Sequence, residues 1–170
     1  MKKKIINIVI ILLYFLLSLY LINTSYKTKT INTTYSKNYK YDNLDEKRLI
    51  IPKINIDLPV IKADSNFNNL NDNLVYYNNF NINNKIIIFG HSGMGVGTFF
   101  NRLDELKKGD IVYLKFNSKT YLYEVLDFYN IDKKDTYILN EEENSNKLLL
   151  VTCTRGKKNK RYVVNLAGKN

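Results

Sequence analysis

Residues 148–166, LLLVTCTRGKKNKRYVVNL, hold two apolar runs that are separated by a short basic segment. The first run ends at Thr152-Cys153 with the only cysteine of the chain, and the second run begins at Arg161. Short apolar runs that are bounded by turn-forming or charged residues are typical of β-strands. We therefore predict two consecutive strands, with Cys153 at the end of one and Arg161 at the start of the next.

The same pattern of short strands recurs through residues 48–170. Apolar residues alternate with polar ones from Ile54 to Val60, which predicts a half-buried strand that Pro52 and Pro59 bracket. The other expected strands cover residues 85–90, 111–116 and 120–131, whereas residues 63–84 are rich in turn-forming residues, with one short apolar piece at 74–77.

Helical segments are scarce in the same region. FFNRLDELKKGD, residues 99–110, predicts one short helix that Gly109 closes. Residues 117–119, Asn-Ser-Lys, predict the turn of a β-hairpin. Many short strands with one short helix predict an all-β fold, either a barrel or a sandwich.

Residues 5–22, IINIVIILLYFLLSLYLI, are uncharged and mostly apolar. Their number is close to the ~20 residues that a helix needs to cross a bilayer. A secretory signal peptide is the alternative, but its apolar core is usually ~7–15 residues long and a small-residue cleavage site follows it. Because NTSYKTKT follows here, we predict an uncleaved membrane anchor at 5–22, a polar linker at 23–47 and a folded domain at 48–170.

The charges around this apolar stretch predict its orientation. Residues 1–4 contain three lysines, and basic residues favour the cytoplasmic side of a membrane. We therefore predict a single-pass protein of the cell membrane, with its N-terminus inside and its folded domain outside the cell. A lone cysteine outside the cell forms no internal disulfide, so Cys153 is incidental, intermolecular or reactive.

The formal net charge is +10 at pH 7, and five basic residues lie between Arg155 and Arg161. The simplest interpretation of this cluster is a solvated loop between two strands. A nucleic-acid site would need a broader basic face with stacking aromatic side chains, and this segment contains no aromatic residue. We therefore expect no nucleic-acid partner.

The chain also has a single histidine, His91, which follows the apolar run IIIFG. If the strands before His91 and Cys153 are neighbours, both side chains reach the same edge of the barrel, since a catalytic cysteine and histidine need only be close in space. An imidazole can accept and return the proton of a thiol near neutral pH. A guanidinium such as that of Arg161 can stabilise the negative charge that develops on a carbonyl oxygen under attack.

Each of these residues also has an ordinary structural interpretation. A lone cysteine often packs as a small apolar side chain, a histidine after glycine is often a loop residue, and an arginine beside lysines is often solvated. Arg155 is a second candidate for the role of Arg161. The segment GHSGMGVGT has neither the lysine of a P-loop nor the full dinucleotide-binding spacing, so we expect its glycines to give flexibility around His91.

Five stretches together resemble the sortase family, the cysteine transpeptidases of Gram-positive cell surfaces. LLVTC, residues 149–153, resembles the family motif TLxTC, with leucine where the first threonine is usual. RYVVNL resembles the family strand that begins with an arginine, and this resemblance favours Arg161 over Arg155. IIIFGHS resembles the family segment that contains the histidine. FFNRLDELKKGDIVYL and IPKINIDLPV resemble two further family segments. The resemblance extends from about Leu49 to Leu166.

The resemblance implies an eight-stranded β-barrel with one or two short helices and a cysteine transpeptidase activity. It implies that Cys153 attacks the carbonyl of a threonine in an LPXTG-like sorting signal. His91 would transfer protons to and from the amines, and Arg161 would hold the substrate and stabilise the oxyanion. An amine of a cell-wall precursor, or another amine acceptor, would then take the acyl group from Cys153. This transfer would anchor surface proteins that carry the signal.

By the same resemblance, Val151, Thr152 and Ser92 are expected to bind the substrate. The compact domain is closest to class D and E or housekeeping-like sortases. We expect no cofactor, although the acidic triplet Glu141-Glu142-Glu143 could mimic the calcium site of some relatives. The alternatives are a caspase-like cysteine protease, whose fold alternates helices with strands, and a non-catalytic membrane-anchored β-barrel that only binds a partner.

Overall fold

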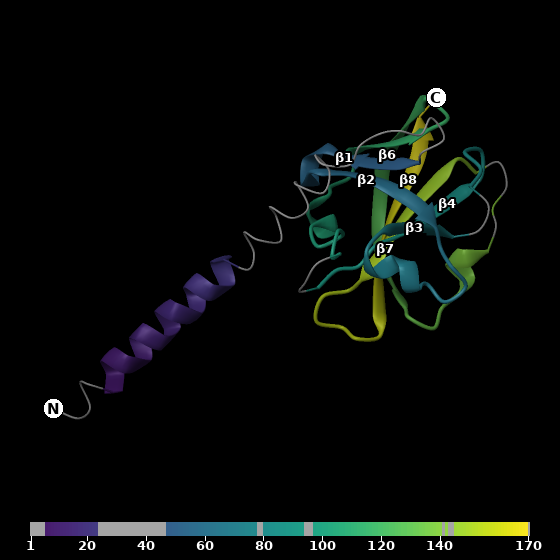
Figure 1. The fold of residues 1–170 in the computed structure, drawn as a ribbon. Coiled ribbons are helices and arrows are strands. Elements are labelled where there is room, and N and C mark those ends of the chain that lie inside the picture. The colour runs from purple at the N-terminus through teal and green to yellow at the C-terminus, as the bar shows by residue number, and fades with distance from the viewer. Residues whose placement is uncertain are drawn as a thin grey trace.

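The computed structural model describes residues 6–23, 47–77, 80–93, 97–140, 142 and 145–169. They form an N-terminal helix and a β-barrel (Figure 1). The predicted cytoplasmic residues 1–4 and most of the predicted linker at 23–47 lie outside the described residues. The domain boundaries around them therefore stay predictions.

The N-terminal helix covers Ile6–Asn23, one residue later at each end than the predicted anchor, and its mean hydropathy is 2.3. Its apolar side chains are exposed on every side, and none of its residues is buried against the rest of the protein. A helix that is apolar all round needs an apolar environment, which a bilayer provides. The helix therefore suggests a membrane anchor, and its orientation in the membrane stays a prediction.

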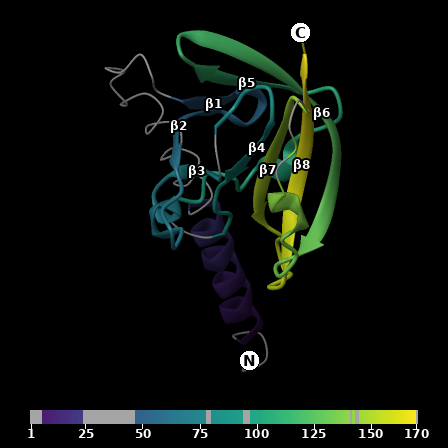
Figure 2. The same ribbon diagram turned by 90° about the vertical axis from the view of Figure 1, so that its right-hand side faces the viewer.

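The barrel has eight strands, and Figures 1 and 2 show it from two sides. In chain order they are β1 (Arg48–Ile51), β2 (Ile56–Lys62), β3 (Leu74–Tyr77), β4 (Lys85–Phe89), β5 (Ile111–Phe116), β6 (Lys119–Asp132), β7 (Lys147–Cys153) and β8 (Lys160–Lys169). The strands close in the order β1-β2-β3-β4-β7-β8-β6-β5. The predicted eight-stranded, all-β barrel is thus confirmed.

Four short 3-10 helices connect the strands: η1 (Pro52–Ile54), η2 (Asn68–Asn71), η3 (Leu103–Glu105) and η4 (Tyr137–Leu139). The short helix predicted over 99–110 is reduced to η3 and its flanking turns. No side-chain hydrogen bond caps the start of η3, and the Leu103 N–H donates instead to the Phe100 carbonyl at 3.2 Å. Gly109 follows with a positive φ of 87°, as a closing glycine does.

The strand predicted over 54–60 is wrong in its boundaries. Ile54 belongs to η1, Asn55 turns the chain in a left-handed conformation, and β2 begins only at Ile56. Pro52 opens η1, where its missing N–H costs nothing. Pro59 lies inside β2, opposite Arg48 of β1, and does not end the strand. Apolar alternation alone could not separate a 3-10 turn from a strand here.

The predicted hairpin joins β5 and β6 through a tighter turn than expected. Phe116 and Lys119 are register partners, so the loop has only the two residues Asn117 and Ser118. Both have a positive φ, 50° and 59°. Two left-handed central residues are the signature of a type I′ turn, whose twist matches that of the flanking strands.

Strands β4 and β7 are buried on both faces, because apolar residues lie inside the barrel and also against its outer surface. Leu148 and Leu150 of β7 belong to the interior core, together with residues from every strand. Leu149 and Val151 point the other way, into a second cluster on the outer face. This outer-face cluster consists of Ile87, Ile131, Ile138, Leu149, Val151 and Val163. Its Ile138 belongs to η4, so that 3-10 helix covers part of the barrel's outer surface.

The described barrel begins at Lys47, and three aromatic rings surround the ammonium group of this lysine. Its Nζ lies 5.5 Å from the ring centroid of Tyr76, 5.2 Å from that of Phe80 and 4.8 Å from that of Phe116. A cation over aromatic faces contributes about 0.5–2 kcal/mol, depending on its exposure. The Lys47 carbonyl also accepts a hydrogen bond from the Val60 N–H at 2.7 Å. The chain is therefore held firmly where it enters the barrel.

Gly90, directly after β4, fills a position where no larger residue fits. A Cβ atom there would lie 2.6 Å from Cδ2 of Phe100 and 2.7 Å from Cδ2 of Leu74. We predict that Gly90→Ala lowers the free energy of unfolding by about 1–3 kcal/mol, as overpacking of a core does. Urea unfolding of the full chain in neutral detergent, followed by fluorescence of the 14 tyrosines, measures this change.

The control is a double-mutant cycle with Phe100→Leu, which takes the aromatic ring away from the new methyl group. The cost of Gly90→Ala should be smaller in the Phe100→Leu background, because contacting residues are coupled. Strictly additive costs would contradict the proposed clash.

Candidate active site

Cys153 and Arg161 lie opposite each other in the antiparallel pair of β7 and β8. Directly opposed residues in such a pair project from the same face of the sheet. Nη1 of Arg161 lies 3.5 Å from the Cys153 sulfur and donates a hydrogen bond to it. The cysteine is partly exposed. A permanent cation therefore contacts an accessible thiol.

His91 reaches the same edge of the sheet because β4 and β7 run parallel and in register to the last residue of β4. The Gly90 N–H continues this ladder and donates to the Val151 carbonyl at 3.1 Å. The Ser92 hydroxyl donates to the Cys153 carbonyl at 2.8 Å. These two hydrogen bonds fix the backbone on either side of His91 against the end of β7.

Burial and Arg161 together set the charge of His91. Both disfavour the imidazolium form, so the pKa of His91 is lower than its ordinary value, and burial is the larger cause. Nε2 of His91 lies 3.3 Å from Oδ1 of Asn71. Because its pKa is lowered, His91 is a neutral base at neutral pH.

Asn101 holds the loop that begins at His91. Its Oδ1 accepts from the Gly93 N–H at 2.7 Å, and its Nδ2 donates to the Gly93 carbonyl and to the Thr98 hydroxyl, both at 2.9 Å. The Phe100 N–H donates to the His91 carbonyl at 2.9 Å. These hydrogen bonds hold the described part of the loop, and because residues 94–96 lie outside the described residues, the expected flexibility stays a prediction.

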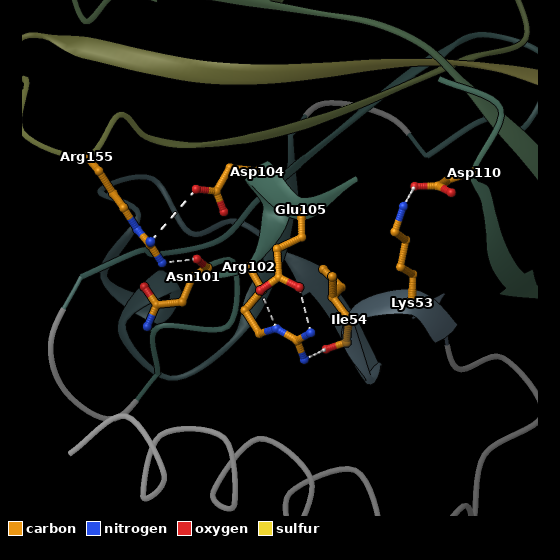
Figure 3. Close-up of polar contacts among 8 residues, drawn as sticks. All are labelled: Lys53, Ile54, Asn101, Arg102, Asp104, Glu105, Asp110 and Arg155. Carbon is orange, nitrogen blue, oxygen red and sulfur yellow. Dashed lines mark hydrogen bonds and ion pairs between the residues drawn. The ribbon is translucent and has the colours of Figure 1, made fainter. Parts of the chain in front are cut away.

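Arg155, the second candidate for the role of Arg161, points away from Cys153. Figure 3 shows its guanidinium directed at Asn101 and Asp104. It donates to the Asn101 carbonyl, and its Nη1 lies 3.8 Å from Oδ2 of Asp104. The structure thus brings Arg161, and not Arg155, to the cysteine.

The residues predicted to bind substrate lie next to Cys153 but are mostly covered. Val151 belongs to the outer-face cluster and is 1% exposed. Thr152 is 5% exposed, and its hydroxyl oxygen has no hydrogen-bond partner in the described structure. Ser92 donates its hydroxyl proton to the Cys153 carbonyl. Support of the cysteine backbone is the role that this geometry favours, and direct contact with substrate stays a prediction.

The acidic triplet considered for calcium is only partly described, since Glu141 and Glu143 lie outside the described residues. The Glu142 carboxylate accepts hydrogen bonds from Lys85 at 2.9 Å and from Lys147 at 2.7 Å. These bonds lower the pKa of Glu142 and occupy both of its oxygens. A calcium ion would have to displace two ammonium groups, so this carboxylate does not fit a calcium site.

The chemistry available at this edge of the barrel is nucleophilic attack on a carbonyl carbon. A thiol becomes a strong nucleophile when a neighbouring base takes its proton. His91 can act as that base. A guanidinium that contacts the sulfur can also donate to the oxyanion that such an attack creates. Comparison with known proteins agrees with this assignment, because the sequence profile of the Sortase domain matches residues 49–167.

The chain belongs to the sortase family. It is 31% identical to Sortase D of Bacillus subtilis over 123 residues, which are 68% of this chain and 60% of that protein. It is 32% identical to Sortase A of Bacillus anthracis over 127 residues, 71% of this chain and 60% of that protein. The chain thus spans about 60% of the length of these two relatives. They agree with the predicted compact, class D-like or housekeeping-like form.

Solved structures show the same barrel. Sortase A from Corynebacterium diphtheriae matches with a TM-score of 0.65 at 25% identity, over 74% of this chain and 61% of that one. A Clostridium perfringens Sortase D5 transpeptidase matches with a TM-score of 0.65 at 19% identity, over 84% of this chain and 98% of that one. The caspase-like alternative is excluded, because it requires helices that alternate with strands and the described barrel contains only 3-10 turns.

The lowered pKa of His91 has a direct test, because this sortase has one histidine and its imidazole proton signals are unambiguous. We predict that Arg161→Gln raises the pKa of His91 towards its ordinary value, since the variant removes a neighbouring positive charge. An NMR titration of the imidazole Cε1 proton measures the change. Arg155→Gln is the matched control and should leave the pKa of His91 in place. An equal rise of the His91 pKa in both variants would mean that Arg161 has no specific influence on that pKa.

Proposed function

We propose that this sortase is a membrane-anchored cysteine transpeptidase that cleaves an LPXTG-like sorting signal and joins the acyl group to a cell-wall amine. The observation that carries the proposal is the position of Cys153 between His91, two residues beyond the end of the neighbouring parallel strand, and Arg161, on the neighbouring antiparallel strand. Clostridium perfringens Sortase D5, which shares the fold, is described as a transpeptidase. The products would be surface proteins linked covalently to the cell wall.

In the first step, the Cys153 sulfur attacks the carbonyl carbon of the signal's threonine after His91 has taken the thiol proton. A C–S bond forms, and the negative charge moves to the carbonyl oxygen, which the Arg161 guanidinium stabilises. The C–N bond to the next residue then breaks. His91 returns its proton to the departing amine, which leaves a thioester on Cys153.

In the second step, a neutral amine attacks the thioester carbonyl. The new C–N bond forms as the C–S bond breaks, and His91 takes the proton that the amine loses. The thiolate then leaves next to Arg161 and is protonated again. The sum of both steps exchanges one amide for another, so no oxidant, reductant or metal is consumed.

Apolar side chains on the face of the sheet that carries Cys153 and Arg161 give the sorting signal a surface to contact. Phe89 of β4, Tyr129 of β6 and Leu139 of η4 pack against the outer-face cluster while keeping part of their surface exposed. Such side chains suit the leucine and proline of an LPXTG-like signal, since apolar contact gives affinity without a charge. The upstream part of the signal would therefore lie over the outer face of β4 and β7.

The helix Ile6–Asn23 would hold the enzyme at the cell membrane as a single-pass anchor with its N-terminus inside. The barrel would then work outside the cell, where surface proteins and cell-wall precursors meet. One free cysteine suits this location, because no second cysteine is present to form a disulfide with it.

The proposed function predicts a covalent intermediate. When the full chain in neutral detergent is mixed with LPXTG-type peptides, we expect a mass adduct on Cys153 that corresponds to the peptide cleaved after its threonine. Added amines should convert the adduct into an amine-linked product. Intact-mass spectrometry of the protein and peptide fractions follows both events, and Cys153→Ala should form neither species.

Two outcomes would contradict the proposal. Release of the free acid alone, even at high amine concentration, would show a hydrolase. No adduct with any peptide, while a small thiol reagent still modifies Cys153, would favour the non-catalytic barrel that binds a partner.

The geometry also predicts different effects on acylation when Arg161 and Arg155 are replaced. Arg161→Ala should lower the rate of acylation by about 100-fold or more, as the removal of one oxyanion donor does. Arg155→Ala removes a guanidinium from the loop before β8 and should change the rate by less than about threefold, since the polar contacts of Arg155 within the described residues are with Asn101 and Asp104. Single-turnover acylation of Cys153 measures both. An equal loss in the two variants would overturn the assignment of Arg161.

A further inference from the structure

The backbone ladder between β4 and β7 ends just before the reacting residues. The two strands pair in parallel up to Phe89 and Val151, and the Gly90 N–H then donates to the Val151 carbonyl at 3.1 Å. Hydrogen bonds recur at even spacing along a parallel ladder. The next bond of a continued ladder would therefore join the Ser92 N–H to the Cys153 carbonyl, two residues further along each chain segment.

The side chain of Ser92 supplies this bond in place of a regular strand. Its hydroxyl donates to the Cys153 carbonyl at 2.8 Å, in partly buried surroundings. Strand β4 itself stops at Phe89. Because a side-chain hydroxyl reaches the carbonyl, the backbone around His91 can depart from the strand while the end of β7 keeps its hydrogen bond.

The Cys153 carbonyl faces β4 because of the pairing on the other side of β7, which lies between β4 and β8 (Figure 2). The Thr154 N–H donates to the Lys160 carbonyl at 3.1 Å. Hydrogen-bonded pairs alternate with non-hydrogen-bonded pairs along an antiparallel ladder, so Cys153 and Arg161 are a non-hydrogen-bonded pair. Their peptide groups point away from each other. The backbone of β8 therefore does not serve this carbonyl, and the Ser92 hydroxyl does.

The segment that carries Ser92 is anchored on its other side by the residues before η3. The His91 carbonyl accepts a hydrogen bond from the Phe100 N–H at 2.9 Å. The Asn101 side chain holds Gly93 through both the N–H and the carbonyl of that glycine. The Ser92 hydroxyl thus joins a fixed loop, which bears the base, directly to the residue that bears the nucleophile.

We propose that Ser92 is a positioning residue, whose hydroxyl sets the spacing between the Cys153 thiol and the His91 imidazole. This inference rests on the proposed transfer function. A proton passes between two groups when their heavy atoms lie about 2.6–3.2 Å apart, and a displacement of about 1 Å can slow a reaction about 100-fold. His91 moves a proton in both steps, so both steps depend on this spacing. In this role the hydroxyl serves the backbone of the enzyme and not the sorting signal.

The kinetic test replaces Ser92 by alanine and by threonine in the full chain in neutral detergent. We expect Ser92→Ala to lower the limiting rate of Cys153 acylation about tenfold or more. The half-saturating concentration of an LPXTG-type peptide should change by less than about twofold, since a positioning residue does not bind the peptide. Ser92→Thr keeps a hydroxyl donor and should stay within about threefold of the wild-type rate. Single-turnover acylation over a range of peptide concentrations measures both quantities.

A second readout reports the hydrogen bond itself. The chain has one cysteine, so labelling with carbonyl-¹³C cysteine gives a single NMR signal. Loss of the hydrogen bond moves this signal to lower frequency, which we expect in Ser92→Ala and not in Ser92→Thr. Ser145→Ala is the matched control, because the Ser145 hydroxyl also donates to a backbone carbonyl, that of Glu142 at 3.0 Å. This control should leave the signal and the acylation rate unchanged.

The outcomes separate this inference from the proposed function. No acylation of the wild-type chain would overturn both. An unchanged limiting rate in Ser92→Ala, or a carbonyl signal that stays in place in that variant, would overturn the positioning role alone. A rise in the half-saturating peptide concentration with an unchanged limiting rate would do the same, because Ser92 would then bind the sorting signal. Slow acylation by Ser92→Thr with its carbonyl signal in place would also count against the role.

Discussion

The parallel ladder between β4 and β7 is the constraint on which the active site depends. His91 and Cys153 are far apart in the chain, and β5 and β6 lie between them in sequence. Their separate strands nevertheless pair residue by residue up to the end of β4. A register slip of one residue would turn Cys153 into the barrel and Thr152 outward, because alternate residues face opposite sides of a sheet. Strands β4 and β7 are buried on both faces, and this burial prevents such a slip. A register shift in either direction would move apolar side chains out of a packed cluster.

The antiparallel pairing of β7 with β8 completes the site from the other side. It places Arg161 opposite Cys153, and β6 continues the row with Ile131. Cys153 and Arg161 thus come from adjacent strands of the sheet. The connections beyond these strands add further contacts. Asn71 lies within hydrogen-bond distance of the His91 imidazole, and Asn101 holds the backbone that follows His91. The nucleophile and the arginine thus lie on strands, whereas the groups around the imidazole lie on the connections between strands.

The sequence predicted the parts of this arrangement that depend on local pattern. Continuous apolar runs predicted β4 and β7, and the single cysteine, the single histidine and Arg161 each adjoin such a run. The 3-10 turn at Ile54 and the position of Pro59 inside β2 were missed, since hydrophobic alternation does not report backbone dihedral angles. Asn71 and Asn101 were missed for another reason: asparagine is so frequent in this chain that no single one stands out. Their contacts depend on loops brought together only by the closed barrel.

The aromatic environment of Lys47 has a mechanical consequence. Under the proposed anchoring, a pull between the membrane and a captured surface protein enters the barrel at Lys47 and passes into β1. This strand is hydrogen-bonded on both sides, to β2 and to β5, so the load spreads over two ladders. In the closed order of the barrel, β7 is four strands away from β1 in either direction. The strand that bears the nucleophile is thus the one farthest from the tether, and the pull crosses four interstrand ladders on either path around the barrel between its two points of attachment.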